Sequence, residues 1–258
     1  MNQDHSLIDT PEMYLRTVLE LEEEGLIPLR ARIAERLGQS VPTASQTVAR
    51  MQRDGLLTVT GDRRIELTPA GRSAATRVMR KHRLAECLLS DVLGLEWQLA
   101  HVEACRWQHV MSEAVERRLL DILGHPTHSP YGNPIPGLAE LGEKERDEIP
   151  QDMVALTNVP RETGRVIMHR IGEPIQSDTA LLTRLRRAGF RPNAALAVSR
   201  ANGTVRIGTG QQAAELDHAA AAHVFVTLPI DPDLAPEPEA LEDHPAARHA
   251  PFSPACNL

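Results

Sequence analysis

The stretch from Leu29 to Arg53, LRARIAERLGQSVPTASQTVARMQR, decides the fold of the N-terminal part. Residues 29–37 have the apolar spacing of a short helix, and residues 38–40 form a tight turn. Pro42 stands where the next helix would begin. Two short helices joined by a tight turn indicate a helix-turn-helix. The second helix would bury one stripe, at i, i+4 and i+7: Ala44, Val48 and Met51.

The residues around this stretch complete a winged helix. Residues 10–24 predict a preceding helix, and Thr68-Pro69 begins a long following one. Residues 56–59 and 65–67 are strand-like, and the turn between them has a basic tip. The alternative is a generic helical bundle whose arginines are only a solvated face.

Charge is distributed unevenly along the 258 residues, whose formal net charge is −7. Residues 25–83 carry twelve Arg and Lys against four acids, whereas residues 1–24 and 231–258 are strongly acidic. A basic segment between acidic flanks is typical of a local nucleic-acid-binding surface. We expect the acidic run Glu22–Glu24 to be a solvated helix end.

Further along the chain, the sequence changes character several times. Residues 68–124 predict helices, which outside a winged domain usually dimerise it, and the prolines of residues 126–136 predict an extended segment. Short strand-like runs after residue 162 indicate a small SH3-like β-barrel. We therefore expect a mainly α fold with a small β part, divided into a winged helix-turn-helix at 1–76, a helical domain at 77–143, a linker at 144–161, an SH3-like domain at 162–230 and a disordered, acidic, proline-rich tail at 231–258.

Composition and motifs exclude several protein classes. The chain has no apolar run of about 18 residues and no secretory signal at its start, and it has only three cysteines. These features favour a cytoplasmic protein without a membrane span or a disulfide framework. The sequence has no Gly-rich phosphate loop, no GxSxG and no HExxH, so we expect no enzyme.

Cysteine and histidine recur at helical spacing. Cys105 and His109 are four residues apart on one predicted helix, His101 lies one turn earlier, and His82 and Glu86 repeat the spacing on the preceding helix. A thiolate and an imidazole one turn apart can hold one metal ion. Taken alone, such a pair is more often part of a packed core, so both interpretations remain open at this point.

Several long motifs resemble the diphtheria toxin repressor family of iron-dependent regulators. The resemblance is close over residues 9–138, loose over residues 162–228 and absent from the tail. It implies a dimeric, metal-activated transcriptional repressor whose second domain binds metal. The motifs are EMYLRT (12–17), LRARIAERL (29–37), SQTVARM (45–51), VMRKHRLAE (78–86), EACRW (103–107) and GNPIPGL (132–138).

The resemblance also implies two metal sites and an anion site. A primary, activating site maps to Met13, Cys105 with its backbone carbonyl, His109 and the position of Gln108, where the family has Glu. An ancillary site maps to His82, Glu86 and His101, completed by Glu173 and Gln176 on the short match over residues 171–176. The anion site maps to Arg83, Ser129 and Asn133.

The ligand types indicate the metal. Thioether and thiolate are soft ligands, which favour Fe(II) or softer ions over Mn(II). We expect Fe(II) to be the physiological ion, and Co(II), Ni(II), Zn(II) or Mn(II) to substitute in vitro. An ion joining Met13 to Cys105 would fix the first helix against the dimerisation helices and thereby select the DNA-competent conformation.

The resemblance places operator contacts on the third helix and just before it. Gln46 would read base edges, Pro42 a thymine methyl, and Arg30 and Arg50 would contact phosphate. Ser40, Thr43 and Ser45 would make further backbone or base contacts.

The resemblance therefore implies an iron(II)-dependent repressor of iron-homeostasis genes that binds palindromic double-stranded operators as a homodimer, possibly two dimers per operator. Because Gln108 replaces a charged ligand, a repressor responding to Zn, Co or Mn is the nearest alternative. A metal-dependent hydrolase or a metal-storage protein is the distant one.

Overall fold

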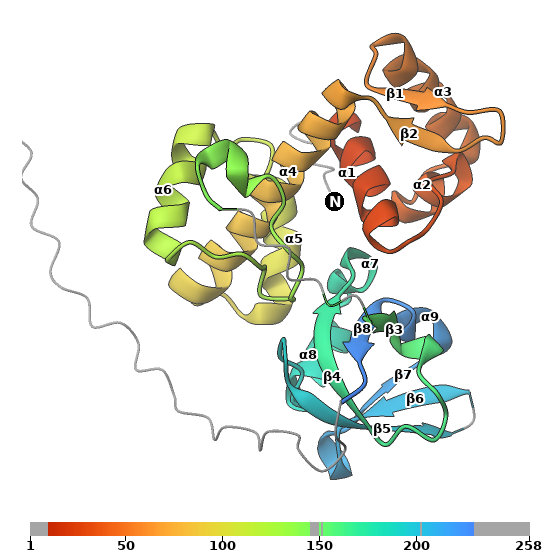
Figure 1. Cartoon of the computed structure of the whole chain (residues 1–258), viewed down its shortest axis with the longest axis vertical. Coiled ribbons are helices and arrows are strands. Elements are labelled where there is room, and N and C mark those ends of the chain that lie inside the picture. Colours follow the sequence, from red (N-terminus) through yellow and green to blue (C-terminus); the bar gives the residue numbers. More distant parts are fainter. Residues whose placement is uncertain (1–9, 145–149, 151, 202, 230–258) are drawn as a thin grey trace, which may run out of the picture.

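The computed structural model describes residues 10–144, 150, 152–201 and 203–229, and it places them in three units (Figure 1). A winged N-terminal unit and a helical unit are joined by α4 (Pro69–Cys87), and a sheet-containing unit follows them. This architecture confirms the expected fold class, a mainly helical chain with a small β part. The expected tail at 231–258 lies outside the described residues.

The winged unit has the element order that the sequence predicts. Ser40 begins α3, because its Oγ accepts a hydrogen bond from the Thr43 amide at 3.2 Å. The predicted stripe of Ala44, Val48 and Met51 is fully buried. The elements are α1 (Thr10–Glu23), α2 (Arg30–Arg36), α3 (Val41–Arg53) and the antiparallel hairpin of β1 (Leu57–Val59) and β2 (Ile65–Leu67).

The helical unit consists of α4, a π-helical turn (Leu88–Val92), α5 (Trp97–Trp107) and α6 (Glu113–Leu123). The break between the helices contains Gly94 in a left-handed conformation, with φ 66°. Arg80 on α4 pairs with Glu116 on α6 at 2.5 Å, and both side chains are buried. Among the described residues, no helix is long and apolar enough to cross a bilayer.

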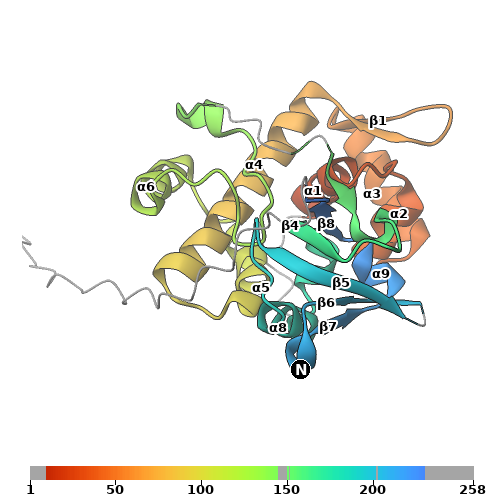
Figure 2. The same ribbon diagram turned by 60° about the horizontal axis from the view of Figure 1, so that its bottom comes forward.

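The C-terminal unit is an antiparallel sheet with strand order β3-β8-β4-β5-β6-β7, and α8 lies beside α5 of the helical unit (Figure 2). Its elements are β3 (Val154–Ala155), β4 (Arg165–Ile171), α7 (Glu173–Gln176), α8 (Thr179–Arg187), β5 (Ala195–Ala201), β6 (Thr204–Ile207), β7 (Ala214–Leu216), α9 (His218–Ala221) and β8 (Val224–Thr227).

Two details of this unit differ from the sequence-based expectation. The sheet begins inside the expected linker, because β3 pairs with β8 and Leu156 and Val159 join the core. In addition, α8 interrupts a region where the sequence suggested only short strands. Its buried leucines, Leu181, Leu182 and Leu185, pack into the core of the sheet.

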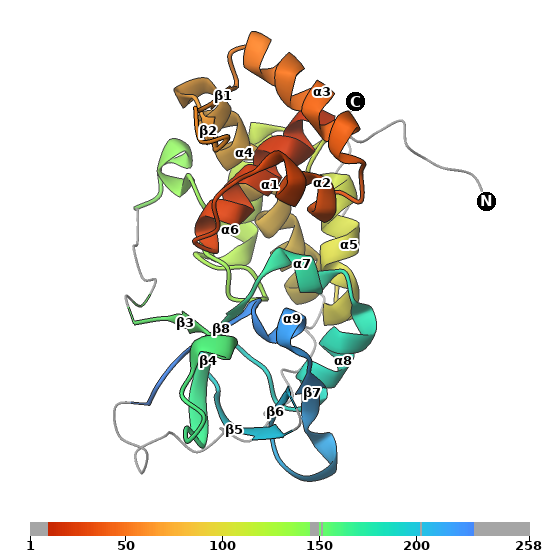
Figure 3. The ribbon, with the colours of Figure 1, turned by 90° about the vertical axis from the view of Figure 1, so that its right-hand side faces the viewer.

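The proline-rich segment packs along the C-terminal unit. The carbonyl oxygen of Tyr131 accepts from the Ile171 amide at 3.0 Å, and Asn133 Nδ2 donates to the Ile171 carbonyl at 2.7 Å. Gly132, with φ 83°, approaches so closely that an added Cβ would lie 1.9 Å from the His169 carbonyl oxygen. The segment therefore fixes the sheet against the helical unit, and α7 lies on the side of the sheet that faces the winged unit (Figure 3).

Candidate metal centre and DNA-binding face

The outer face of α3 carries the residues that the sequence assigns to operator contacts, at the end of the molecule remote from the sheet (Figure 3). Pro42, Thr43, Gln46 and Arg50 are exposed, and Arg30 and Ser45 are half-buried. Ser40 is exposed too, but its hydroxyl already caps α3.

Three of the four residues expected at the primary site meet where α1 touches the end of α5. The amide of Gln108 donates to the Ala104 carbonyl and ends α5, which turns the Gln108 and His109 side chains toward α1. Gln108 Nε2 lies 3.2 Å from Met13 Sδ and 2.9 Å from His109 Nε2. We call Met13, Gln108 and His109 the junction group, because it joins the winged and helical units.

Cys105 is separated from the junction group by the side chain of Arg16. Its Sγ lies 3.7 Å from His101 Nε2 and accepts from Arg16 Nη1 at 3.5 Å. The same Arg16 nitrogen donates to Gln108 Oε1 at 2.8 Å, so the guanidinium stands between Cys105 and the junction group. Burial opposes ionisation of the Cys105 thiol, but the charges of Arg16, His101 and His82 outweigh it and hold the pKa of the thiol well below its usual value.

Three of the residues expected at the ancillary site form a buried cluster between α4 and α5. Glu86 Oε1 lies 2.7 Å from His82 Nε2 and 3.0 Å from His101 Nδ1. Burial lowers the pKa of His101, but the Cys105 thiolate and Glu86 outweigh it and raise that pKa to about 10. We call His82, Glu86 and His101 the histidine group.

The two expected ancillary ligands from the C-terminal unit lie on α7. Glu173 Oε1 pairs with Arg83 Nη2 at 2.6 Å, and against the effect of burial this guanidinium holds the pKa of Glu173 at about 2. Gln176 donates through Nε2 to the Ile171 carbonyl, whereas its buried Oε1 has no hydrogen-bond partner. A buried acceptor without a donor is costly, and a nearby cation would satisfy it.

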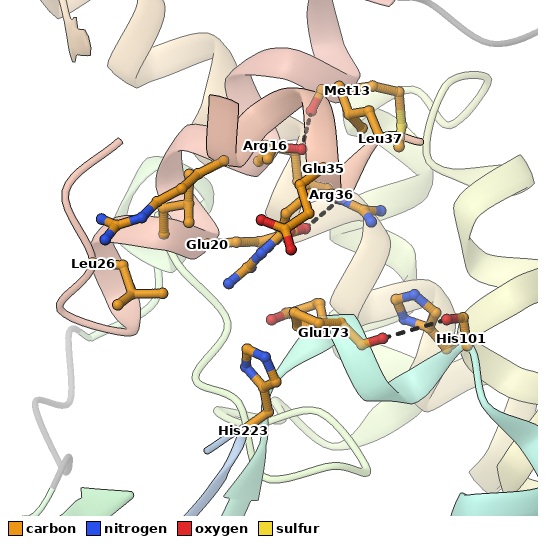
Figure 4. Close-up of a pocket in the computed structure, with 15 residues that line it drawn as sticks. Met13, Arg16, Glu20, Leu26, Glu35, Arg36, Leu37, His101, Glu173 and His223 are labelled. Carbon is orange, nitrogen blue, oxygen red and sulfur yellow. Dashed lines mark hydrogen bonds and ion pairs between the residues drawn. The ribbon is translucent and has the colours of Figure 1, made fainter. Parts of the chain in front are cut away.

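Glu173 and His101 also line a cavity of about 490 Å³ between the winged unit and the C-terminal unit (Figure 4). Glu20 and Arg36 line it from α1 and α2, and His223 lines it from the sheet side. The expected ancillary ligands therefore lie beside a polar interdomain space.

The residues expected at the anion site already have internal partners. Arg83 donates to both Glu23 oxygens, at 2.6 and 3.0 Å, as well as to Glu173. Asn133 Oδ1 accepts from Arg170, and Ser129 Oγ accepts from the Tyr131 amide at 3.3 Å. A free anion at Arg83 would have to replace one of the two carboxylates.

The interpretation of Glu22–Glu24 as a solvated end is wrong for two of its residues. Glu23 pairs with Arg83, as described above. Glu24 pairs with Arg36 at 2.5 Å and with His223 at 3.2 Å, and its side chain is only 3% exposed. Glu23 and Glu24 are paired because the helical and C-terminal units lie against the end of α1, and no local sequence pattern predicts these contacts.

Arg16 is the important residue that sequence reasoning missed. It is 5% exposed, and its Nε lies 2.7 Å from Glu20 Oε1. The sequence offered one sign that Arg16 is buried and paired. It stands one turn after Met13 on a helix with an apolar face, and Glu20 follows it at i+4. The same pattern occurs on many solvated helices.

The donor set suits a divalent ion of intermediate to soft character. It offers one thiolate, one thioether, imidazoles and carboxylates, all buried or half-buried. The ligands come from α1, α4, α5 and α7, so ions at the two expected sites would together contact all three units.

Comparison with known proteins shows which family the chain resembles. Residues 6–65 match the family "Iron dependent repressor, N-terminal DNA binding domain", and residues 68–137 match "Iron dependent repressor, metal binding and dimerisation domain". Of the solved structures, a manganese-dependent transcriptional repressor in complex with manganese is similar with a TM-score of 0.70 and 26% identity, over 85% of this chain and 100% of that one.

Curated relatives are more similar in sequence. The iron-dependent repressor IdeR of Mycobacterium tuberculosis is 59% identical over 198 residues, which are 75% of this chain and 85% of the relative. The diphtheria toxin repressor of Corynebacterium diphtheriae is 57% identical over 188 residues, 72% of this chain and 82% of the relative. The chain thus belongs to the family of iron-dependent repressors.

Proposed function

We propose that this protein is an iron(II)-activated transcriptional repressor that binds palindromic operator DNA as a homodimer and controls iron-homeostasis genes. One observation carries the proposal. Candidate ligands from the winged unit and from the helical unit meet in the junction group, where Gln108 contacts Met13. An ion bound there would favour the conformation in which both units keep this position.

Two sets of residues would hold the two ions. Met13, Gln108, His109 and Cys105 would hold the activating ion, and His82, Glu86, His101, Glu173 and Gln176 the ancillary one. The ion would supply the attraction that fixes α1 against α5. The exposed face of α3 would then enter the major groove, with Gln46 toward base edges and Arg50 toward phosphate.

An exposed apolar surface supports the dimer. Leu93, Leu99 and Val102, at the break before α5 and along it, are 57%, 40% and 38% exposed, and Val92 beside them is 50% exposed. Contiguous exposed apolar side chains mark an interaction surface. A second copy bound there would place two α3 helices on one palindrome, and two such dimers could occupy one operator.

A second candidate is a repressor of the same kind that responds to Zn(II) or Co(II). It is favoured by the neutral Gln108, because the Cys105 thiolate alone then balances the charge of the activating ion, and the remaining donors are soft.

A metal-series mobility shift on the promoter fragment upstream of the gene tests both candidates. With Fe(II) under anaerobic conditions we expect specific binding, and loss of that binding with a chelator. Equal affinity with and without metal would overturn activation by metal. Activation by Zn(II) at a much lower free concentration than by Fe(II) would favour the second candidate.

A further inference from the structure

Arg170 on β4 is a buried cation whose hydrogen-bond acceptors are all neutral. It is 3% exposed; its Nη1 donates to Asn133 Oδ1 at 3.2 Å, and its Nη2 donates to the Glu23 carbonyl at 2.7 Å. The ring of Phe225 lies 4.0 Å from the guanidinium carbon, and Nε is buried without a hydrogen-bond partner. Burial of a charge is costly unless a group of opposite charge compensates it.

Two carboxylates near Arg170 pair with another arginine instead. Glu23 and Glu173 both lie 2.6 Å from Arg83 Nη2. Burial lowers the pKa of Arg170, and the charges of Glu23 and Glu173 offset this effect only in part. The Arg170 guanidinium is therefore incompletely compensated, and its Nε remains available to an acceptor from outside.

Arg170 also lines a cavity of about 240 Å³ between the proline-rich segment and the C-terminal unit. Pro134 lines it from the segment, and Met153 and Pro192 line it from the C-terminal unit. Liquid water occupies about 30 Å³ per molecule, so this space has room for a small organic molecule. The residues of the expected anion site do not line it, so we treat it as a separate space and call it the Arg170 cavity.

The lining of the Arg170 cavity suits a singly charged anion with a short apolar body. Among its described lining residues, Arg170 alone carries a fixed positive charge, and burial lowers the pKa of His169, which is therefore neutral near pH 7. One positive charge compensates one negative charge, whereas a phosphate dianion would leave charge uncompensated in a buried place. Pro134, Pro192 and Met153 offer apolar contact to a short hydrocarbon chain.

We propose that the Arg170 cavity binds a short-chain monocarboxylate, one of whose oxygens accepts a hydrogen bond from Arg170 Nε. A hydrogen bond between two charged groups is shorter and stronger than one between neutral groups. The bound anion supplies the charge that Arg170 lacks among its acceptors, and it satisfies a buried donor.

The position of Arg170 gives such a ligand an effect on activation, which rests on the proposed function. Arg170 belongs to the C-terminal unit but reaches Glu23 at the end of α1 and Asn133 on the proline-rich segment. An anion that holds this side chain in place favours the conformation in which the winged and C-terminal units stay together. We therefore expect a saturating carboxylate to lower the Fe(II) concentration needed for half-activation.

Two sources can supply the carboxylate, a small molecule or an acid of this chain. Residues 231–243 contain six Asp and Glu. The first of them follows residue 229, where the described chain ends after β8, by two positions, and β8 pairs with β4. The experiment below distinguishes these two sources.

Calorimetric titration of the full, metal-free chain with sodium butyrate tests the Arg170 cavity. We expect saturable one-to-one binding that is weakened at least about tenfold in Arg170→Gln. Arg165→Gln is the matched control and should bind as the unchanged chain does, because Arg165 is an exposed arginine of the same strand. Unweakened binding in Arg170→Gln, equal losses in the two variants, or tighter binding of inorganic phosphate than of butyrate would overturn the proposal.

A full-length variant with the six acids of residues 231–243 changed to amides identifies the source. Equal butyrate binding by this variant and the unchanged chain assigns the cavity to a small molecule. Binding by the amide variant alone shows that an acid of the chain occupies the cavity, and the Arg170→Gln comparison is then made in that background. Absence of saturable binding in both proteins would overturn the proposal.

Two further measurements complete the test. Met153→Trp narrows the cavity but keeps Arg170, so it should abolish butyrate binding even if circular dichroism shows that Arg170→Gln is misfolded; full binding in Met153→Trp would overturn the proposal. Operator binding titrated with Fe(II) at saturating butyrate tests the effect on activation, which an unchanged or higher Fe(II) requirement would overturn. Butyrate binding is read without DNA or metal, so failure of iron-dependent operator binding would overturn the proposed function and leave the carboxylate site standing.

Discussion

The junction group and the histidine group use similar donors but are held in different ways. The histidine group lies entirely within the helical unit, is buried, and is tied together by Glu86. The junction group takes Met13 from the winged unit and Gln108 and His109 from the helical unit. Residues on packed helices of one unit keep their positions through that unit's own core. Residues from two units meet only while the units stay together, so only the junction group can couple metal binding to the placement of α3.

The largest expected effect concerns the stability of the histidine group. Glu86→Ala leaves two buried imidazoles without their shared carboxylate, and loss of one member of a buried ion pair costs about 3–5 kcal/mol. Urea unfolding in chelator-treated buffer measures the change in the free energy of unfolding. Glu12→Ala is the matched control, because Glu12 pairs with His109 but its side chain is 33% exposed. Its removal should cost less than about 1 kcal/mol. Equal losses of unfolding free energy in the two variants would show that Glu86 stabilises the protein no more than Glu12 does.

The next effect concerns coupling rather than stability. Met13→Leu keeps the apolar volume on α1 but removes the thioether from the junction group. We expect the Fe(II)-induced gain in operator affinity to fall by about 1–3 kcal/mol, the usual size of an allosteric coupling free energy. Anaerobic mobility shifts with and without Fe(II) give this gain for each protein.

Met111→Leu is the control for this measurement, because Met111 is buried between α5 and α6 and belongs to neither group. It should leave the Fe(II)-induced gain unchanged. A full gain in Met13→Leu would mean that the sulfur of Met13 is not a ligand.

The same contrast explains what the sequence could predict. The winged helix and the pairing of His82 with Glu86 follow from spacing within one stripe or one helix, as with Ala44, Val48 and Met51, whereas the grouping of His101 with them was implied only by the family resemblance. The burial of Arg16 and Glu24 depends on contacts between units, and a charged residue on a helix gives no local sign of them. Likewise β3 is two residues long, too short for a periodicity, and it is recognisable only by its pairing with β8. The buried leucines of α8 stand at i, i+1 and i+4, a helical spacing that the expectation of short strands did not use.

A smaller test separates DNA recognition from both groups. Gln46→Ala removes an exposed amide from α3, and a good bidentate base contact is worth about 1–3 kcal/mol of discrimination. We expect weaker binding to the operator, with unchanged non-specific binding and an unchanged Fe(II) concentration for half-activation. Arg50→Ala should instead weaken binding to all sequences and reduce its salt dependence. Uniform weakening by Gln46→Ala would place Gln46 on phosphate.

The smallest expected effect comes from Gln108→Glu, which changes the charge of the junction group with almost no change in shape. Gln108 is fully buried, and its Oε1 accepts from Arg16 at 2.8 Å while its Nε2 faces Met13 and His109. In the variant one carboxylate oxygen can keep the bond to Arg16, and the other replaces the amide nitrogen on the side of Met13. A divalent ion there then has a thiolate and a carboxylate instead of a thiolate alone, and less charge stays uncompensated in a buried place.

Half-activation should therefore occur at a lower Fe(II) concentration, by up to about tenfold, which corresponds to about 1.4 kcal/mol. The gain is limited because the new carboxylate also binds Arg16 more strongly and must share its charge with that guanidinium. Arg16→Leu in the Gln108→Glu background removes this competition, so the double variant should need less Fe(II) than the sum of the single changes predicts. Operator binding titrated with Fe(II), and separately with Zn(II), measures both shifts. An unchanged or higher Fe(II) requirement in Gln108→Glu would mean either that the amide already binds the ion as well as a carboxylate does, or that position 108 does not contact the ion.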